Sequence, residues 1–237
     1  MSIAGPGQHP LDNPIWHALT GPQVEFALGG GPLRFFAPEV APFTAFEERD
    51  EAALISALAD PAAVPAQIVL FRPQLEPAPA GWTLAYQSGV VQMVCPDDSR
   101  LDDSGLAESA SVVRLGPADL PEMLELVALA QPGPFGPRTP ELGAYFGVRE
   151  GGRLVALTGE RLRLGGFTEV SAVCTHPDWR GRGLARRTVS RVARKAFSEQ
   201  QTPFLHVIAG NVGAIRLYGS LGFVERARLQ LSVWGPV

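Results

Sequence analysis

The chain has 237 residues, of which 46% are hydrophobic and 19% are charged, and its formal net charge is −4. These proportions are typical of a soluble globular protein with one large domain or two small ones. The slightly acidic balance gives no support for a nucleic-acid partner or for a polybasic attachment to a membrane.

Cysteine content and the N-terminal residues indicate the compartment. Cys95 and Cys174 are too few for a disulfide framework, which favours a reducing environment. Residues 1–10 have neither a basic start nor an apolar core, so no signal peptide is predicted. The most apolar window, residues 52–71, is interrupted by charged and proline residues and is not a membrane span. We therefore predict a cytoplasmic protein.

The first half of the chain is predicted to form a small α/β unit. Residues 1–20 are rich in Gly, Pro, His and Asn and are expected to wrap the surface. The elements that follow are strands, apart from one helix over 46–59, with the strands at residues 24–28, 33–36, 67–71, 82–86 and 90–95. The polar, acidic stretch 96–109 is typical of a linker, and we place a domain boundary there.

The second half is predicted to alternate strands and helices around one sheet. The helices are expected after Pro117, after the glycines near residue 183, and over residues 212–221. The strands are expected at residues 112–115, 145–149, 154–160, 167–175, 204–208 and 226–233.

A glycine-rich turn at residues 180–185, with the sequence Arg-Gly-Arg-Gly-Leu-Ala, joins an apolar strand to a helix. Unpaired N–H groups point out of the first turn of a helix, and together with the helix dipole they attract anions such as phosphate. Arg180 and Arg182 add positive charge. The alternative is a tight turn that needs glycine only for its backbone conformation.

A faint repeat connects the two halves. Gly81-Trp82 and Gly222-Phe223 are both glycine-aromatic steps that lead into a closing strand. The repeat favours a first half that is a degenerate copy of the second and lacks the 180–185 turn. Two unrelated α/β halves would also produce it.

Two motifs of the second half resemble the GNAT superfamily of CoA-dependent N-acetyltransferases. One is Q/R-x-x-G-x-G/A and the other is N-x-x-A-x-x-L-Y-x-x-x-G-F, met respectively by Arg180, Gly183 and Ala185 and by Asn211, Ala214, Leu217-Tyr218 and Gly222-Phe223. Residues 167–183 and 203–207 resemble, more narrowly, the glycine N-acyltransferase-like branch. The resemblance implies an α/β (α+β) GNAT fold, with a mixed central sheet and a splayed strand pair. The catalytic GNAT domain would span residues 110–237, after a degenerate GNAT-like domain over 1–100.

The resemblance also implies acetyl-CoA as co-substrate and no metal. The pyrophosphate would lie on the backbone N–H groups of Arg180, Gly181, Arg182, Gly183, Leu184 and Ala185. The pantetheine arm would pair with the strand edge at Val173, Cys174 and Thr175, and an amide near Val173 would polarise the thioester carbonyl. Asn211, Ala214 and Tyr218 would complete the cofactor site. A nucleophilic Cys174 is the alternative, but direct transfer in this family favours a packing residue.

Two catalytic roles follow from the resemblance. Glu169, on the strand that would carry the thioester, is the candidate base that deprotonates the amine, with Glu160 as a second choice. Tyr218 stands where the family places the acid that protonates the departing thiolate, and a phenol pKa of about 10 is near a thiol's of about 8.5. The alternatives are a glutamate paired with an arginine and an aromatic in the core.

Three other polar residues are interpreted more simply. Asn211 is expected to contact the cofactor, to cap the helix that follows, or both. His206 is expected to be a core histidine, with a role in the site as the alternative, and His176 is expected to be a turn residue rather than a ligand. No spacing of His and Cys predicts a metal site.

We therefore expect an N-acetyltransferase that passes the acetyl group of acetyl-CoA directly to a primary amine of a small molecule or amino acid. It would work through a ternary complex, as a monomer or homodimer, without nucleic-acid or membrane partners. The acceptor would be lined by residues 131–140 and 162–167 and by the first half. A CoA-binding sensor without turnover is the alternative. A nucleotide-binding or nucleic-acid-binding domain is disfavoured because no Walker lysine follows the glycines.

Overall fold

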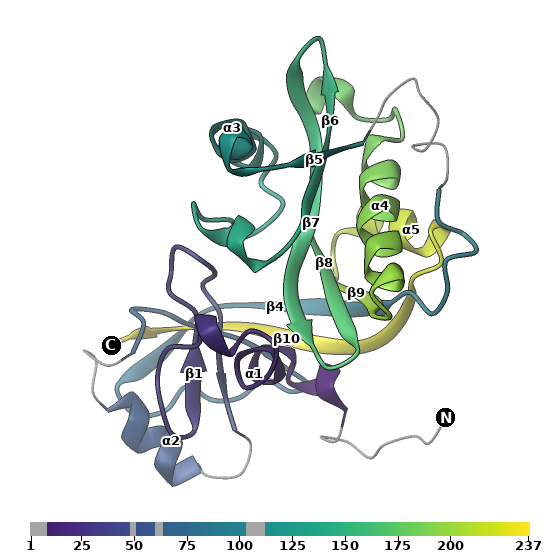
Figure 1. The fold of residues 1–237 in the computed structure, drawn as a ribbon. Coiled ribbons are helices and arrows are strands. Elements are labelled where there is room, and N and C mark those ends of the chain that lie inside the picture. Colours follow the sequence, from purple (N-terminus) through teal and green to yellow (C-terminus); the bar gives the residue numbers. More distant parts are fainter. Residues whose placement is uncertain (1–8, 48–50, 60–63, 103–111) are drawn as a thin grey trace.

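The computed structural model describes residues 9–47, 51–59, 64–102 and 112–237. Its centre is a twisted eight-stranded sheet, in which β8 and β9 form a parallel pair and the other pairs are antiparallel (Figure 1). The strands lie in the order β3 (Ile68–Arg72), β10 (Val224–Pro236), β4 (Trp82–Val94), β9 (Thr202–Ile208), β8 (Phe167–Thr175), β7 (Arg153–Leu164), β6 (Tyr145–Glu150) and β5 (Val113–Leu115).

Helices cover both faces of this sheet. Figure 1 shows α3 (Leu120–Ala130) on one side of β7, and α4 (Leu184–Ser198) and α5 (Val212–Ser220) on the other. The N-terminal segments add α1 (Pro14–Leu19), α2 (Glu51–Leu58) and a small sheet of β1 (Leu33–Phe35) and β2 (Thr44–Phe46). Short 3-10 turns complete the elements at η1 (Pro10–Asp12), η2 (Val24–Phe26), η4 (Pro117–Asp119), η5 (Thr139–Leu142) and η6 (Pro177–Trp179). None of the described helices is long and apolar enough to cross a membrane.

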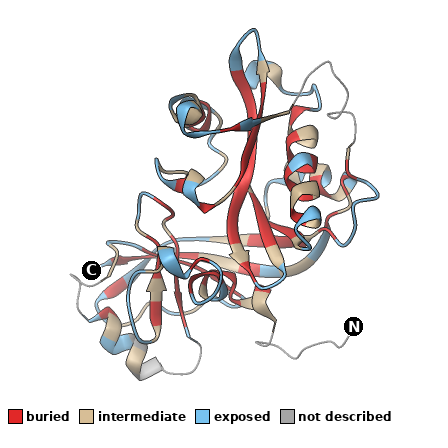
Figure 2. Ribbon diagram, in the orientation of Figure 1, coloured by how far each residue is buried: buried red, intermediate tan, exposed pale blue. Residues whose placement is uncertain are grey.

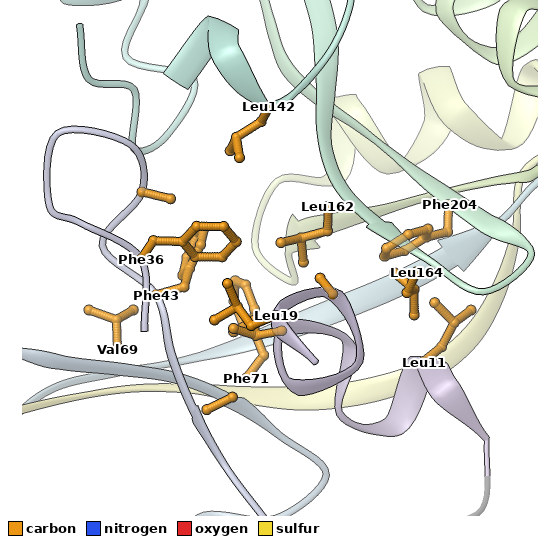
Figure 3. Packing of buried hydrophobic residues seen from close by; sticks show 14 of the residues in the cluster. Leu11, Leu19, Phe36, Phe43, Val69, Phe71, Leu142, Leu162, Leu164 and Phe204 are labelled. Carbon is orange, nitrogen blue, oxygen red and sulfur yellow. The ribbon is translucent and has the colours of Figure 1, made fainter. Parts of the chain in front are cut away.

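The alternation of side chains along the central strands builds one core on each face. Val91 and Leu205 point towards α4 and α5, whereas Val90 and Phe204 point towards the N-terminal segments. Figure 3 shows Phe204 and other sheet residues against side chains of the N-terminal segments. Figure 2 shows the buried residues concentrated along the central strands and on the side of α4 that faces them.

The two halves of the sequence share this sheet. Strand β4 of the first half lies between β9 and β10 of the second, and β3 pairs with the far edge of β10. The predicted boundary between 1–100 and 110–237 falls in residues 96–109, of which 103–109 lie outside the described residues. Strands from both sides of that boundary are therefore interleaved. The interpretation of the first half as a degenerate repeat stays a prediction.

The sequence-based elements need correction mainly in the first half. Residues 24–28 contain the 3-10 turn η2, not a strand, and residues 82–95 form the single strand β4 rather than two. The predicted helix over 46–59 is shorter in the structure, where α2 spans Glu51–Leu58 and Phe46 belongs to β2. The segment expected to wrap the surface contributes Leu11 and Leu19, both 0% exposed, to the core. From residue 112 onward, every predicted strand and helix is present within a few residues.

A row of polar side chains, most of them buried, crosses the sheet on the face covered by the N-terminal segments. We call it the polar row, and it takes one residue from each adjacent strand: Arg226 (β10), Gln92 (β4), His206 (β9), Glu169 (β8) and Arg161 (β7). Arg226 Nη1 donates to Gln92 Oε1 at 2.8 Å, and Gln92 Nε2 lies 3.0 Å from His206 Nε2. His206 Nδ1 lies 2.7 Å from Glu169 Oε1, and Arg161 donates to both oxygens of Glu169 at 2.7 and 2.8 Å.

Glu169 is the anion of the polar row, and its side chain is 0% exposed. Burial alone would raise the pKa of this carboxyl group. The charge of Arg161, together with hydrogen bonds from Arg161 and His206, outweighs burial and lowers the pKa to about 2. The ionised form of Glu169 is thus the form that the fold requires.

The interleaved sheet predicts that the second half does not fold alone. Removing residues 1–100 takes β4 out from between β9 and β10 and uncovers the apolar cluster on that face. We expect a fragment of residues 110–237 to be insoluble or to lack a cooperative thermal transition in circular dichroism. Co-expression with residues 1–100 is the control and should restore a soluble complex. Cooperative unfolding of the lone fragment would contradict the prediction.

Glu169 also predicts how stability depends on pH. Its pKa is about 2 in the folded protein and about 4.3 in an unfolded chain. The unfolded state therefore binds the extra proton, and the free energy of unfolding falls as the pH drops from about 5 towards 2, by about 3 kcal/mol from this group. We expect Glu169→Gln to flatten this acid limb in urea denaturation curves, and to destabilise the protein at neutral pH because Arg161 loses its partner.

The matched control for this experiment is Glu150→Gln. Glu150 is an exposed glutamate at the end of β6. Its replacement should leave the acid limb of the stability curve unchanged. Equal pH slopes for the wild type and Glu169→Gln would show that the carboxyl group of Glu169 does not carry this linkage.

Candidate active site

A cavity of about 1040 Å³ opens where β8 and β9 separate. The parallel pairing of the two strands ends at Glu169 and Phe204, although β8 continues to Thr175 and β9 to Ile208. Unpaired strand edges therefore face each other across a gap. The cavity passes from the 180–185 turn on one side to side chains of the N-terminal half on the other.

A bulge in β8 lies at this gap. Ser171 pairs with Gly159 and Cys174 pairs with Leu157, so the two residues between Ser171 and Cys174 face a single residue of β7. One of them, Ala172, has φ 54°, a left-handed conformation that is rare outside glycine. The predicted cofactor residues Val173, Cys174 and Thr175 all line the cavity beside this bulge.

The 180–185 turn forms one end of the cavity. Gly181 and Gly183 have φ 76° and 75°, and a Cβ on either would meet no atom within 4 Å. Positive φ, not crowding, thus requires these glycines, and the space beside them is open. Gly183 makes no side-chain cap for α4, so the first amides of this helix are free to bind an anion. The turn therefore fits the pyrophosphate of acetyl-CoA.

The predicted residues of this turn do not all reach the cavity. Arg180, Gly181 and Ala185 line it. The Arg182 guanidinium lies over the ring of Trp179, 5.8 Å from its centroid, and Leu184 is buried in the core at 4% exposed. The side chains of Arg182 and Leu184 therefore do not line the cavity.

Helix α5 supplies the neighbouring wall. Asn211, Ala214 and Tyr218 line the cavity, and Asn211 Oδ1 accepts from the Ala214 amide at 3.1 Å. The expected helix cap at Asn211 is therefore present. Tyr218 is 7% exposed, and burial raises its pKa to about 12. Among the described residues no group hydrogen-bonds its hydroxyl, so the phenol can donate a proton into the cavity.

Cys174 lines the cavity but is poorly suited to act as a nucleophile. Burial raises the pKa of its thiol to about 12, with the side chain 5% exposed. The reactive form of cysteine is the thiolate. At neutral pH almost none of it would be present at this position.

The two glutamates considered as bases lie beside the cavity and do not line it. Both oxygens of Glu169 accept hydrogen bonds within the polar row. Glu160 is likewise 0% exposed, with Oε2 accepting from the Ala144 amide at 2.9 Å and Oε1 lying 3.0 Å from Lys195 Nζ. Each carboxylate is thus occupied by structural partners, and the arginine pairing considered for Glu169 is the arrangement found.

His206 does line the cavity, with a side chain that is 3% exposed. The ionised Glu169 can only accept, so Nδ1 of His206 must carry the proton. Gln92 donates from Nε2, because its Oε1 accepts from Arg226, and His206 Nε2 therefore accepts. The ring also stacks on Phe71 at 4.7 Å. His206 is the satisfied core histidine that the sequence indicates.

The other end of the cavity is built largely by the first half of the chain. We call it the distal compartment; besides Arg161 and His206, its walls are mainly apolar or aromatic: Pro42, Phe43, Gln67, Val69, Phe71, Tyr86, Leu231 and Val233. Residues 131–134 also line the cavity, as expected for the proline-rich loop. The 162–167 hairpin does not, because Leu162 and Leu164 are buried in the core at 0% and 1% exposed.

Sequence reasoning missed Arg161 and the aromatic residues of the distal compartment. The available signal for Arg161 was an arginine that follows Glu160 in the middle of a predicted strand, where a charged side chain needs a partner if it is buried. Nothing in the local sequence marks Phe43 or Phe71. His176 is the turn residue expected, since its Nδ1 accepts from the Asp178 amide at 3.3 Å. Within the described ranges, no three His, Cys, Asp or Glu side chains gather as metal ligands would.

Comparisons with known proteins agree with this architecture. The FR47-like protein family matches residues 145–233. A GNAT-family protein of Novosphingobium aromaticivorans is 37% identical, with 97% of this chain and 100% of that chain covered and a TM-score of 0.86. No curated protein sequence matches significantly.

Two more distant structures share the fold alone. A GCN5-related N-acetyltransferase of Kribbella flavida is 21% identical, covers 87% of this chain and 88% of its own, and has a TM-score of 0.60. A functionally unknown protein of Staphylococcus epidermidis is 10% identical over 88% and 93%, also with a TM-score of 0.60. The 37% identity to the Novosphingobium protein, over nearly the whole of both chains, decides the family. The chain belongs to the GNAT family of acetyltransferases.

Proposed function

We propose that the protein transfers the acetyl group of acetyl-CoA directly to a primary amine of a small molecule or amino acid, within a ternary complex. The observation that supports this most is the single cavity between β8 and β9. It connects the amide-lined 180–185 turn to the distal compartment through the gap that Tyr218 faces. Coenzyme and amine would therefore meet inside the sheet.

Backbone groups hold the coenzyme in this proposal. The amides of the 180–185 turn bind the pyrophosphate, and the free edge of β8 at residues 173–175 pairs with the pantetheine arm. Bound in this way, acetyl-CoA supplies an activated acetyl thioester. The bulge at Ala172 interrupts the regular pairing of β8 with β7 next to Val173, and the amide of Val173 is the proposed donor that polarises the thioester carbonyl.

Tyr218 acts as the general acid. Because burial raises its pKa to about 12, the phenol stays protonated throughout the working pH range. Its proton passes to the coenzyme sulfur as the carbon–sulfur bond breaks, and the phenolate so formed takes up the proton that the amine nitrogen gives up as it becomes an amide. A thiolate confined to the same buried space is itself a strong proton acceptor.

Glu169 is better suited to positioning than to direct catalysis as a base. A general base works best with a pKa near the operating pH, whereas Glu169 has a pKa of about 2 and both of its oxygens are engaged. No Asp or Glu is among the described residues that line the cavity, and its charged side chains are Arg161 and Arg180. This environment disfavours an ammonium ion. We infer that the acceptor binds as the neutral amine and that Glu169 orients Arg161 and His206.

The test of this function is acetyl-CoA-dependent release of CoA with a panel of primary amines. We expect turnover by the wild type and, for Tyr218→Phe, a kcat lowered about 100-fold with nearly unchanged affinity for CoA, because only the proton donor is lost. The CoA released can be followed with a thiol reagent, and CoA binding by calorimetry.

Two outcomes would contradict the proposal. Unaltered kcat at saturating substrates in Tyr218→Phe would remove this residue from the mechanism. Binding of CoA without turnover across the whole panel would favour a CoA-binding sensor. The thermal transition of Tyr218→Phe should match that of the wild type, since the ring still packs against Phe223.

Because no Asp or Glu is among the described residues that line the cavity, we predict a pH profile of the reaction rate that depends on the acceptor. If only the neutral amine reacts, kcat/KM rises with pH until the pKa of the acceptor, and then stays level because Tyr218 keeps its proton up to about pH 12. Two acceptors with amine pKa values of about 8 and about 10 should therefore show inflections about two pH units apart. A common inflection for both acceptors would instead indicate a titrating base on the protein.

A further inference from the structure

Arg161 is a nearly buried cation at the wall of the distal compartment. The residue is 7% exposed and lines the cavity. Its guanidinium lies over the ring of Phe43, 4.6 Å from the centroid, so that one face of the group is covered. That face is therefore closed to a ligand, and the hydrogen-bond donors of the group lie along its edges.

One of those edges is taken and another is free. Nε and Nη2 each donate to an oxygen of Glu169, at 2.8 and 2.7 Å. A guanidinium has five N–H donors, so the two of Nη1 and the second of Nη2 remain. Among the described residues nothing accepts from Nη1, and this nitrogen is not sealed from the cavity that Arg161 lines. Together the free N–H groups form a fork of the kind that binds a carboxylate with two parallel hydrogen bonds.

The charge around this fork limits what it can bind. Glu169 already neutralises Arg161, so a doubly charged phosphate would bring excess negative charge next to a buried carboxylate. A singly charged, planar carboxylate matches the fork in shape and brings less charge. Leaving the donors without a partner in a site closed by substrate would be unfavourable.

The remaining walls indicate what the carboxylate is attached to. Phe43, Phe71, Val69 and Leu231 offer apolar surface on the same side of the sheet, and Tyr86 offers an aromatic ring that is 52% exposed. Such walls favour an apolar or aromatic ligand body. They offer no partner for a second charged group.

We propose that the acceptor is a carboxylate-bearing amine with an apolar or aromatic body, and that Arg161 binds its carboxylate end-on through Nη1 and Nη2. This specificity rests on the proposed acetyl transfer to an amine. The amine end lies towards the gap between β8 and β9, the apolar body lies against Phe43 and Phe71, and Arg161 selects acceptors that carry the anion.

The first experiment uses ligands that cannot react. Binding of 3-phenylpropanoate and of its neutral amide, 3-phenylpropanamide, is measured by calorimetry on the full-length protein with saturating CoA. We expect the carboxylate to bind roughly 10-fold to 100-fold more tightly than the amide. Equal binding, or tighter binding of phenethyl phosphate than of the carboxylate, would overturn the proposal. This comparison needs no variant.

Arg161→Lys then tests the fork itself. The lysine ammonium can still pair with Glu169 but has no second edge to offer. We expect the variant to lose most of the preference for the carboxylate, with amide binding and CoA affinity unchanged. The matched control is Arg163→Lys on the same strand, whose guanidinium pairs with Glu160 and Glu199 and does not line the cavity; it should keep the preference. An unchanged preference in a folded Arg161→Lys protein would overturn the role of Arg161.

Turnover separates this inference from the proposed function. Preferred binding of the carboxylate without CoA release from any amine would support the anion site while removing acetyl transfer. CoA release at equal kcat/KM, corrected to the neutral amine, from phenylalanine and from phenethylamine would overturn the anion site while leaving acetyl transfer in place.

Discussion

The structure depends on how one buried carboxylate is satisfied at the place where two strands part. Backbone pairing between β8 and β9 stops at Glu169 and Phe204, and from there side chains hold the strands together. Glu169 accepts from Arg161 on β7 and from His206 on β9, so it joins three strands at the edge of the gap. Burying a carboxylate is unfavourable unless it is both paired and fully hydrogen-bonded. The polar row meets both conditions. The two strands can therefore stay paired up to Glu169 and Phe204 and separate beyond these residues to form the cavity.

The N-terminal half makes this arrangement possible by covering it. The carbonyl oxygen of Leu11 accepts from Gln92 Nε2 at 2.8 Å, and Asp12 pairs with Arg226 at 2.7 Å, so the first helical turns close the far end of the polar row. Phe43 covers one face of the Arg161 guanidinium, and Phe71 stacks on the ring of His206. The two ends of the cavity are therefore built mainly by different halves of the sequence. The second half of the chain provides the amides of the 180–185 turn, and the first half provides most walls of the distal compartment.

Features that depend on residues close together in the sequence could be predicted from it, whereas features that depend on contacts between distant segments could not. The turn at Gly181 and Gly183 and the cap at Asn211 are fixed by neighbouring residues, and both are found as expected. The sequence predicts two strands at 82–86 and 90–95, yet residues 87–89 between them also pair with β10, so that β4 is continuous. The partners of Glu169 lie 8 and 37 residues away. The position of Glu169 beside the site was predictable from its place on the strand. Its hydrogen bonds with Arg161 and His206 were not, because they form only where three strands come together.

The same ion pair that stabilises the sheet also limits its chemistry. A glutamate with a pKa of about 2 cannot take up a proton near neutral pH, so the residue placed nearest the reaction by its strand is removed from acid–base work. Among the described residues, the titratable side chains that line the cavity are two arginines, the phenols of Tyr86 and Tyr218, the imidazole of His206, which Glu169 and Gln92 engage, and a thiol whose pKa is about 12. In the proposed acetyl transfer, acceleration would come from holding a neutral amine next to the thioester and from donating a proton to the departing sulfur. In this proposal the acceptor is selected by charge state as well as by shape, because no described residue that lines the cavity is an anion that would stabilise an ammonium ion.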